Sequence, residues 1–104
     1  MDIELLDSAL AEAGEAAAWY DEQVPALGAD FLQELDRAVS SISERPQTWP
    51  RLGQVRGRSF RRFLLSRFPY GVVYTILPAH ALVVAVAHLR RRPQYWADRV
   101  PPSG

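Results

Sequence analysis

The 104-residue sequence contains no cysteine and no lysine, so all twelve of its basic residues are arginines. Without cysteine there is no disulfide framework and no thiolate metal site, which fits a reducing cytoplasm. Arginine binds phosphate and carboxylate through paired hydrogen bonds, but it keeps its proton near neutral pH. The basic residues are therefore suited to holding anions and poorly suited to moving protons.

Long apolar runs are also missing, because no stretch approaches the roughly 20 apolar residues needed to span a bilayer. The acidic N-terminus, Met1 to Glu4, is unlike a signal peptide. We find no metal-ligand spacing, glycine-rich phosphate loop or nucleophile elbow. These absences predict a cytoplasmic protein without membrane contact, metal ion or cofactor. Its length predicts one domain over residues 1–100, followed by a flexible tail, 101–104.

The charges that are present divide by position, although the formal net charge is zero. Residues 1–48 carry eleven acidic and two basic residues, a net charge of −9. Residues 49–104 carry ten arginines and one acidic residue, Asp98, a net charge of +9. An all-arginine half of this kind indicates a surface that meets phosphate or an acidic partner.

The acidic half has the periodicity of two helices. A first helix is predicted from Ser8, with apolar residues at steps of three and four that include Leu10. A second is predicted to open at Pro25 and to end at Pro46. Helices joined by so few residues pack as an antiparallel hairpin. We take the acidic residues from Glu12 to Glu44 as its solvated face.

The basic half has the pattern of strands. Residues 46–59 hold two prolines and two glycines and are predicted to be a loop, pinned to the core by Trp49 and Leu52. Strands are predicted at 61–65, 70–77 and 82–89, and Pro93 should open a short helix through Trp96.

Residues 3–6 could add a short strand at the start of the chain. The fold class is then α+β, with the helical hairpin packed on a small, mainly antiparallel sheet and a short C-terminal helix. The helices should cover one sheet face and leave the other to the arginines or to a partner.

Several short motifs occur in one order along nearly the whole chain. They are Ala18-Trp19-Tyr20, then Pro25-x-Leu27-Gly28-x-x-Phe31-Leu32, Pro46 and Pro50, Arg67-Phe68-Pro69-Tyr70-x-Val72-Val73-Tyr74, and Ala87-His88-x-Arg90-Arg91-x-Pro93-x-Tyr95-Trp96. With this order and spacing, the chain resembles the RelE/ParE superfamily of toxins from bacterial type II toxin–antitoxin modules. The resemblance is greatest to its ParE-like, plasmid stabilisation branch.

This resemblance implies a small toxin silenced by a cognate antitoxin, whose acidic, amphipathic segment folds onto the toxin. ParE-like members are known for poisoning DNA gyrase, whereas RelE-like members cut mRNA on the ribosome. The implied partners are thus an antitoxin and either gyrase or the ribosome with its mRNA. A homodimer or a toxin–antitoxin hetero-oligomer is also possible.

RNA cleavage of the RelE type needs a base, an acid and positive charge at the phosphate. Several RelE-like nucleases use lysine for this, and this chain has none. An arginine often found after the aromatic residue at the start of the third strand is Gly71 here. The remaining candidates for catalysis are His88, Arg90, Arg91 and Tyr95. His88 could instead be structural, with its ring hydrogen-bonded to a backbone carbonyl or near Trp96.

The candidates for binding the target or the antitoxin are Arg61, Arg62, Arg67, Arg90, Arg91, Arg92, Tyr95 and Trp96. Arg61 and Arg62 must point to opposite faces of their strand, so only one can join the C-terminal arginines. Trp96 could stack on a base or anchor the C-terminal helix, and we favour the anchor. Trp19 and Tyr20 are predicted to be core residues.

Three functions remain open at this point. The first is a toxin that binds and poisons DNA gyrase without catalysis, and the missing lysines favour it. The second is a ribosome-dependent mRNA endonuclease that uses His88. The third is a degenerate toxin that only binds its antitoxin.

Overall fold

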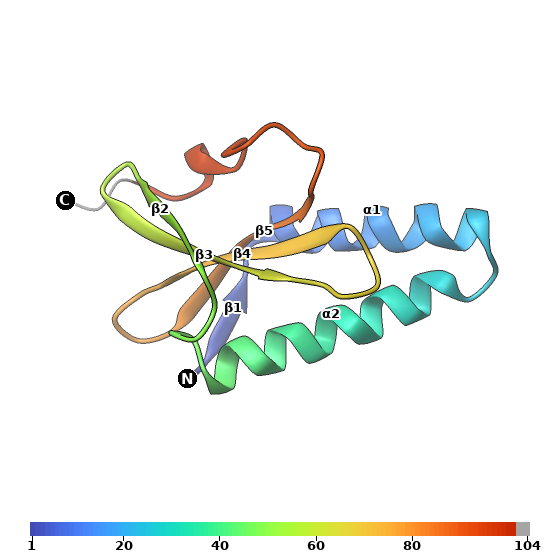
Figure 1. Ribbon diagram of the computed structural model, residues 1–104, viewed down its shortest axis with the longest axis horizontal. Helices are drawn as coiled ribbons and strands as arrows, with labels where there is room; N and C mark the ends of the chain where they lie inside the picture. Colours follow the sequence, from blue (N-terminus) through green and yellow to red (C-terminus); the bar gives the residue numbers. More distant parts are fainter. Residues whose placement is uncertain (102–104) are drawn as a thin grey trace.

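The computed structural model describes residues 1–101 and places a hairpin of two helices against a five-stranded sheet (Figure 1). In chain order the elements are β1 (Ile3–Leu5), α1 (Asp7–Gln23), α2 (Leu27–Glu44), β2 (Arg51–Val55), β3 (Arg58–Leu64), β4 (Tyr70–Ile76), β5 (Ala81–His88) and the 3-10 turn η1 (Ala97–Arg99). The strand order is β1-β5-β4-β3-β2, in which β1 runs parallel to β5 and the other pairs are antiparallel. The α+β class and the mainly antiparallel sheet are confirmed. Of the predicted tail, 102–104 lie outside the described residues.

Helix α1 packs on β5 through small side chains. Its buried residues, all at steps of three or four, are Ala9, Ala13, Ala16 and Ala17. Residues at this spacing share one face of a helix, and alanine allows that face to approach the sheet closely. Leu10 was predicted to belong to the buried face, and this is wrong, since it lies at the margin of the alanine stripe and is exposed.

The two helices meet closely at Gly28, in the first turn of α2. The Gly28 amide donates to the Asp21 carboxylate at 2.7 Å, and a Cβ at Gly28 would lie 2.3 Å from the Ala17 carbonyl oxygen. Only glycine allows this approach. The predicted start at Pro25 is wrong by two residues, because Ala26 has φ 70° and the helix begins after it.

The predicted loop at 46–59 is wrong in part, because it contains β2 and the start of β3. Arg56 and Gly57 join the two strands, and both have positive φ, 55° and 78°. Two left-handed residues make the tight turn whose twist matches paired strands. An arginine in the first of these positions is not a recognisable turn signal, so the glycines and prolines predicted only a loop.

The remaining loop between α2 and β2 is attached to the sheet. Trp49 makes part of this attachment, as predicted. Its ring packs on Phe63 with centroids 4.4 Å apart. The Tyr74 hydroxyl donates to the Pro46 carbonyl at 2.6 Å, and burial raises the pKa of this tyrosine to about 12. Arg61 Nη1 donates to the Trp49 carbonyl at 2.7 Å. These contacts fix where β2 begins.

The sheet has an apolar cluster on each face. One lies under α1 and α2, as predicted. The other lies under residues 89–101, here called the C-terminal segment, which crosses back over the sheet (Figure 1). Trp96 and Val100 are buried there with Phe60 and Val73. The prediction of a free second face is therefore wrong in part, since the chain itself covers some of it. The predicted helix from Pro93 through Trp96 is also wrong, because turns precede η1.

Candidate functional site

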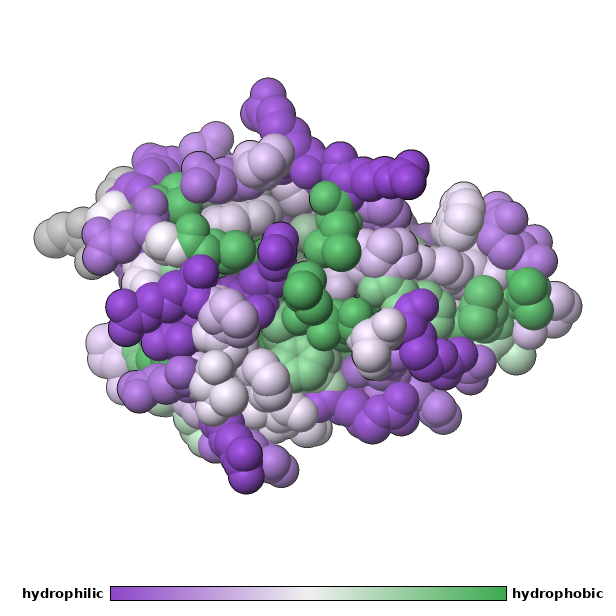
Figure 2. Space-filling view, in the orientation of Figure 1, coloured by the Kyte–Doolittle hydropathy of each residue, from purple (hydrophilic) through white to green (hydrophobic). Residues whose placement is uncertain are grey.

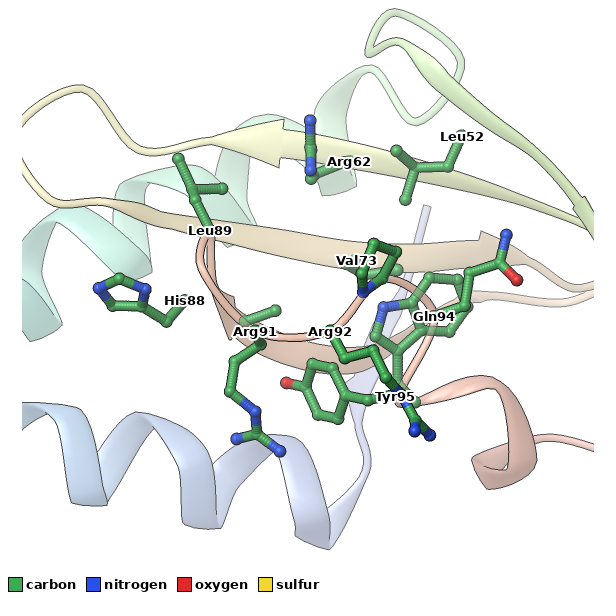
Figure 3. A pocket seen from close by; sticks show the side chains of 12 residues that line it. Leu52, Arg62, Val73, His88, Leu89, Arg91, Arg92, Gln94 and Tyr95 are labelled. Atoms are coloured by element: carbon green, nitrogen blue, oxygen red, sulfur yellow. The ribbon is translucent and has the colours of Figure 1, made fainter.

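The first candidate site is a hollow of about 210 Å³ between the C-terminal segment and strands β3–β5, here called the C-terminal hollow (Figure 3). Basic and aromatic side chains line it together with apolar ones, and they come from β2 to β5 as well as the segment. The lining residues that bear on function are Arg62, His88, Arg91, Arg92, Tyr95 and Trp96. All six were candidates from the sequence, five of them near the C-terminus and Arg62 in β3.

Arg62 reaches this hollow because Gly71 leaves it room. A Cβ at Gly71 would lie 2.8 Å from Arg62 Cδ and 2.9 Å from Cγ. The arginine stem therefore lies flat across β4, where a side chain would otherwise stand. Arg61 points to the other face, toward the Gln47 and Trp49 carbonyls, so of this pair Arg62 alone faces the C-terminal arginines.

The arginines that were predicted to bind the target or the antitoxin do not lie on one surface. Arg91 and Arg92 line the C-terminal hollow with Arg62, and Arg90 is exposed beside them. Figure 2 shows hydrophilic side chains projecting from the top of the molecule, where Figure 1 has the C-terminal segment. Arg67 lies apart, on the β3–β4 loop, with its guanidinium 3.6 Å from Asp30.

His88 is held in place by its neighbours at the end of β5. Its Nδ1 accepts a hydrogen bond from the Arg90 amide at 3.0 Å, and its ring meets Tyr70 edge-on at 5.0 Å. We had expected a structural His88 to bond a backbone carbonyl, whereas the partner is a backbone N–H. Accepting through Nδ1 leaves Nε2 as the nitrogen that could face a partner.

Tyr95 is occupied by a contact that the sequence did not predict. Its hydroxyl donates to Glu12 Oε2 at 2.5 Å, and Arg99 binds the same carboxylate through both terminal nitrogens, at 2.9 and 3.0 Å. The Val86 amide donates to Glu12 as well, at 3.0 Å. Glu12, on α1, was assigned to a solvated face, and this is wrong, since its side chain is only 13% exposed.

These contacts shift the pKa values of Tyr95 and Glu12. Burial and the Glu12 hydrogen bond and charge raise the pKa of Tyr95 well above its ordinary value of 10. Burial alone would raise the pKa of Glu12, but the bonds from Arg99, Tyr95 and Val86 outweigh it and lower that pKa below 4.5. Tyr95 thus stays protonated and Glu12 charged near neutral pH, and neither is poised to exchange a proton there.

The aromatic residues fall into two groups. Trp96 is 4% exposed and packs on Phe60 with centroids 4.7 Å apart, which confirms it as an anchor of the C-terminal segment. Arg91 is exposed and its guanidinium lies over the Tyr95 ring at 4.0 Å, a cation–π contact (Figure 3). Trp19 was predicted to be in the core and is 55% exposed, so this prediction is wrong.

Trp19 lines a second hollow of about 310 Å³, here called the lateral groove, between α1 and the end of β5. The groove is also lined by Glu15, Tyr70, His88 and Arg91. An exposed tryptophan beside an arginine is the composition of strong protein-binding sites. His88 and Arg91 border both hollows, so the two form one continuous surface.

Two classes of site are not found in the part of the chain that the structure describes. Residues 1–101 hold no group of three His, Cys, Asp or Glu side chains arranged to bind a metal ion. Within the same residues, neither helix combines the length and apolar character that crossing a bilayer requires.

Comparison with known proteins identifies the class to which this fold and surface belong. A family model described as "ParE toxin of type II toxin-antitoxin system, parDE" matches residues 3–93. The chain therefore belongs to the ParE toxin family of type II toxin–antitoxin systems, as its resemblance indicated. Membership of this family implies a cognate antitoxin as partner.

One solved structure supports the fold. The structure titled "Chromosomal ParDE TA system from P. aeruginosa" superposes with a TM-score of 0.74. The match covers 85% of this chain and 95% of that chain at 17% sequence identity, a level that speaks for the fold alone. A comparison with curated proteins gives no match.

Proposed function

We propose that this ParE-family toxin inhibits growth by binding and poisoning DNA gyrase, and that it does so without catalysing a reaction itself. The observation that carries the proposal is the state of its candidate catalytic groups. Tyr95 is bound to Glu12 and kept protonated, and the arginines around it cannot exchange protons near neutral pH. An arginine-rich surface with fixed aromatic side chains suits binding rather than acid–base chemistry.

The test is a supercoiling and cleavage assay with purified gyrase and the toxin. We expect wild-type toxin to inhibit supercoiling or to trap gyrase-dependent DNA breaks. Arg91→Gln and Arg92→Gln together should weaken this effect about tenfold or more, because hot-spot arginines commonly contribute 2 kcal/mol or more. Arg37→Gln, an exposed arginine on α2, is the matched control and should leave it unchanged.

The result that would overturn this target is gyrase left untouched by a large excess of folded toxin. Growth arrest without any effect on gyrase would point to another target. No growth arrest on expression would point to the degenerate toxin that only binds its antitoxin.

The mRNA endonuclease remains the second candidate, because His88 and Arg91 border the same two hollows. A base and a phosphate-binding cation at such proximity are two of the three groups that RNA cleavage needs. His88→Ala separates the two functions. A nuclease would lose translation-dependent mRNA cuts, whereas a gyrase poison should retain growth arrest with the DNA-damage response.

We further propose that the antitoxin neutralises the toxin by folding an acidic, amphipathic segment along the lateral groove and onto the C-terminal arginines. Trp19 and Leu89 are exposed there and supply apolar contacts, and Arg90–Arg92 supply the complementary charge. Trp19→Ala should weaken antitoxin binding at least tenfold, as measured by calorimetry. Equal affinity of wild type and variant would place the antitoxin elsewhere.

Both proposals concern a protein that meets its partners in the cytoplasm, where gyrase acts. Without the antitoxin, the exposed apolar residues should promote self-association, so we expect a homodimer at high concentration and a hetero-oligomer with the antitoxin. Sedimentation of the toxin with and without the antitoxin measures both states.

A further inference from the structure

A third hollow lies away from the surface discussed so far, at the far edge of the sheet. It has a volume of about 450 Å³ and is bordered by β2, β3 and the end of β4. The β2–β3 turn lies well away from the helical hairpin (Figure 1). The polar residues that line this hollow, here called the edge hollow, are Gln47, Arg51, Gln54, Arg58, Ser59, Arg61 and Thr75.

The edge hollow collects positive charge that no carboxylate of residues 1–101 balances through an ion pair. Its lining includes three arginines and no acidic residue. Within residues 1–101, the arginines that form ion pairs are Arg56, Arg67 and Arg99, none of which lines it. Arg51 and Arg61 are also direct partners across β2 and β3, and like charges facing each other across strands are destabilising. A bound anion would remove this repulsion.

The guanidinium of Arg61 is held in position before any ligand arrives. Its Nη1 donates to the Gln47 and Trp49 carbonyls at 3.0 and 2.7 Å. These bonds leave other N–H groups of its fork to bind a ligand, and an arginine that is already fixed loses less entropy on binding. Arg58 borders the hollow too, but its Nε donates to the Pro101 carbonyl of the C-terminal segment at 3.3 Å, so its guanidinium lies toward the other face of the sheet.

The lining also distinguishes among anionic partners. Strong protein–protein sites have apolar or aromatic anchors, and unpaired bases stack on aromatic rings. The edge hollow has no aromatic residue in its lining, and Ile76 is its only large aliphatic one. Arginine, glutamine and serine are the side chains that hold the phosphates of a nucleic-acid backbone. The composition thus fits phosphate groups and lacks what an acidic protein segment or a flipped base would need.

We propose that the edge hollow binds the phosphodiester backbone of a nucleic-acid duplex without reading its bases. The contact would use Arg51 and Arg61, which are partners across β2 and β3. It requires neither gyrase nor the antitoxin, so it stands independently of the function proposed above.

The test is fluorescence anisotropy of the purified toxin with a labelled DNA duplex of about 20 base pairs, over a range of salt concentrations. Each phosphate contact contributes nearly one unit to the slope of log K against log salt concentration. We therefore expect Arg51→Gln to flatten this slope by about one unit and to weaken binding several-fold at about 50 mM salt. This variant should keep or raise the thermal midpoint of the wild type, because it removes the like-charge pair, and this separates lost binding from misfolding.

Arg37→Gln is the matched control, because it removes one exposed arginine from α2, away from the edge hollow. The proposal is overturned if Arg37→Gln flattens the slope as much as Arg51→Gln does, since binding would then follow net charge alone. It is also overturned if wild type does not bind the duplex at about 50 mM salt, or if polyglutamate competes as well as DNA. A duplex of RNA with the same sequence shows which nucleic acid supplies the phosphates.

Discussion

Glu12 joins three parts of the molecule that are far apart in the sequence. It lies on α1 and binds the Val86 amide of β5, the Tyr95 hydroxyl and the Arg99 guanidinium. Its side chain and that of Arg99 are 13% and 23% exposed, so this ion pair is largely shielded from water. A partly buried carboxylate that accepts four hydrogen bonds, two of them from a guanidinium, is a strong restraint, because charge-assisted hydrogen bonds are stronger than neutral ones.

We expect Glu12→Gln to lower the free energy of unfolding by about 2 kcal/mol, because hydrogen bonds to a charged group contribute roughly 1.5–3 kcal/mol. Equilibrium urea unfolding measures the change. Glu15→Gln, an exposed carboxylate on the same helix, is the control and should change stability by less than about 0.5 kcal/mol. Equal losses from the two variants would contradict a special role for Glu12.

The same carboxylate should make stability depend on pH. Its hydrogen bonds hold the pKa of Glu12 below 4.5 in the folded protein despite its burial. A carboxyl group with a lowered folded-state pKa stabilises the fold above its unfolded pKa and loses that effect as pH falls through the folded pKa. The difference between wild type and Glu12→Gln should therefore be greatest near neutral pH, and it should shrink as the pH falls below 4.5 and through the lowered folded-state pKa. A difference in the free energy of unfolding between the two proteins that stays constant with pH would contradict this prediction.

Gly71 and Arg62 form a second pair at the residue scale. The Cβ of Gly71→Ala would overlap the middle of the Arg62 side chain, so this variant should lose about 1–3 kcal/mol of stability. In an Arg62→Ala background the overlap is gone, and Gly71→Ala should then cost less than about 0.5 kcal/mol. A double-mutant cycle by urea unfolding measures the coupling, and additive effects would show that Gly71 does not serve to seat Arg62.

At the scale of elements, the helical hairpin depends on Gly28. Gly28→Ala places a methyl group 2.3 Å from a backbone oxygen of α1, which can move only if the helices separate. We expect a loss of about 2 kcal/mol or more in thermal or urea unfolding, as for other overpacked sites. The same substitution at Gly14, also in a helix, meets nothing within 4 Å and should be neutral or slightly stabilising. A neutral Gly28→Ala would show that the helices are not in contact there.

The β3–β4 loop is a second element with an unexpected attachment. Glu34 of α2 is 7% exposed, and its Oε2 accepts the Ser66 and Arg67 amides at 2.6 and 3.1 Å. The loop is thereby fixed to the helix beneath it. Arg67 is directed along α2 toward Asp30, away from the C-terminal arginines that it was predicted to join.

At the scale of the whole molecule, the C-terminal segment completes the second core. Ending the chain after Arg92 would remove Trp96 and Val100 and uncover Phe60 and Val73. We expect this truncated protein to bind the dye ANS and to self-associate in sedimentation experiments, because a contiguous apolar face becomes exposed. A chain that ends at Pro101 is the control and should behave as the full chain does. A truncated protein that stays monomeric and binds no dye would show that the C-terminal segment does not complete the second core.

Much of the fold could be predicted from the sequence because it depends on local patterns. The apolar period gave both helices, and runs of β-branched residues gave β3, β4 and β5. The missed strand, β2, lies where glycine and proline dominate, and its turn uses an arginine in a left-handed conformation. Such a conformation depends on the pairing of the two strands rather than on the residues themselves.

The site could be predicted less fully. The C-terminal arginines, His88 and Tyr95 were found because they are close in sequence. Glu12 and Arg99 were missed, because carboxylates at the helical period look the same in sequence whether they face water or a buried guanidinium. Trp19 was misplaced for the same reason, since its position next to Tyr20 does not say which side of α1 faces the sheet.

By itself, the sequence determined the class of chemistry available to this protein. A chain without cysteine or lysine, with every positive charge on an arginine, can hold anions but has few groups that exchange protons near neutral pH. Strand alternation in the sequence already placed Arg61 and Arg62 on opposite faces. Only the tertiary structure decided which of them meets the C-terminal arginines, because the chain folds back over the face that carries Arg62 and closes Tyr95 onto Glu12. Contacts between residues distant in the sequence are properties of packing, which no local pattern specifies.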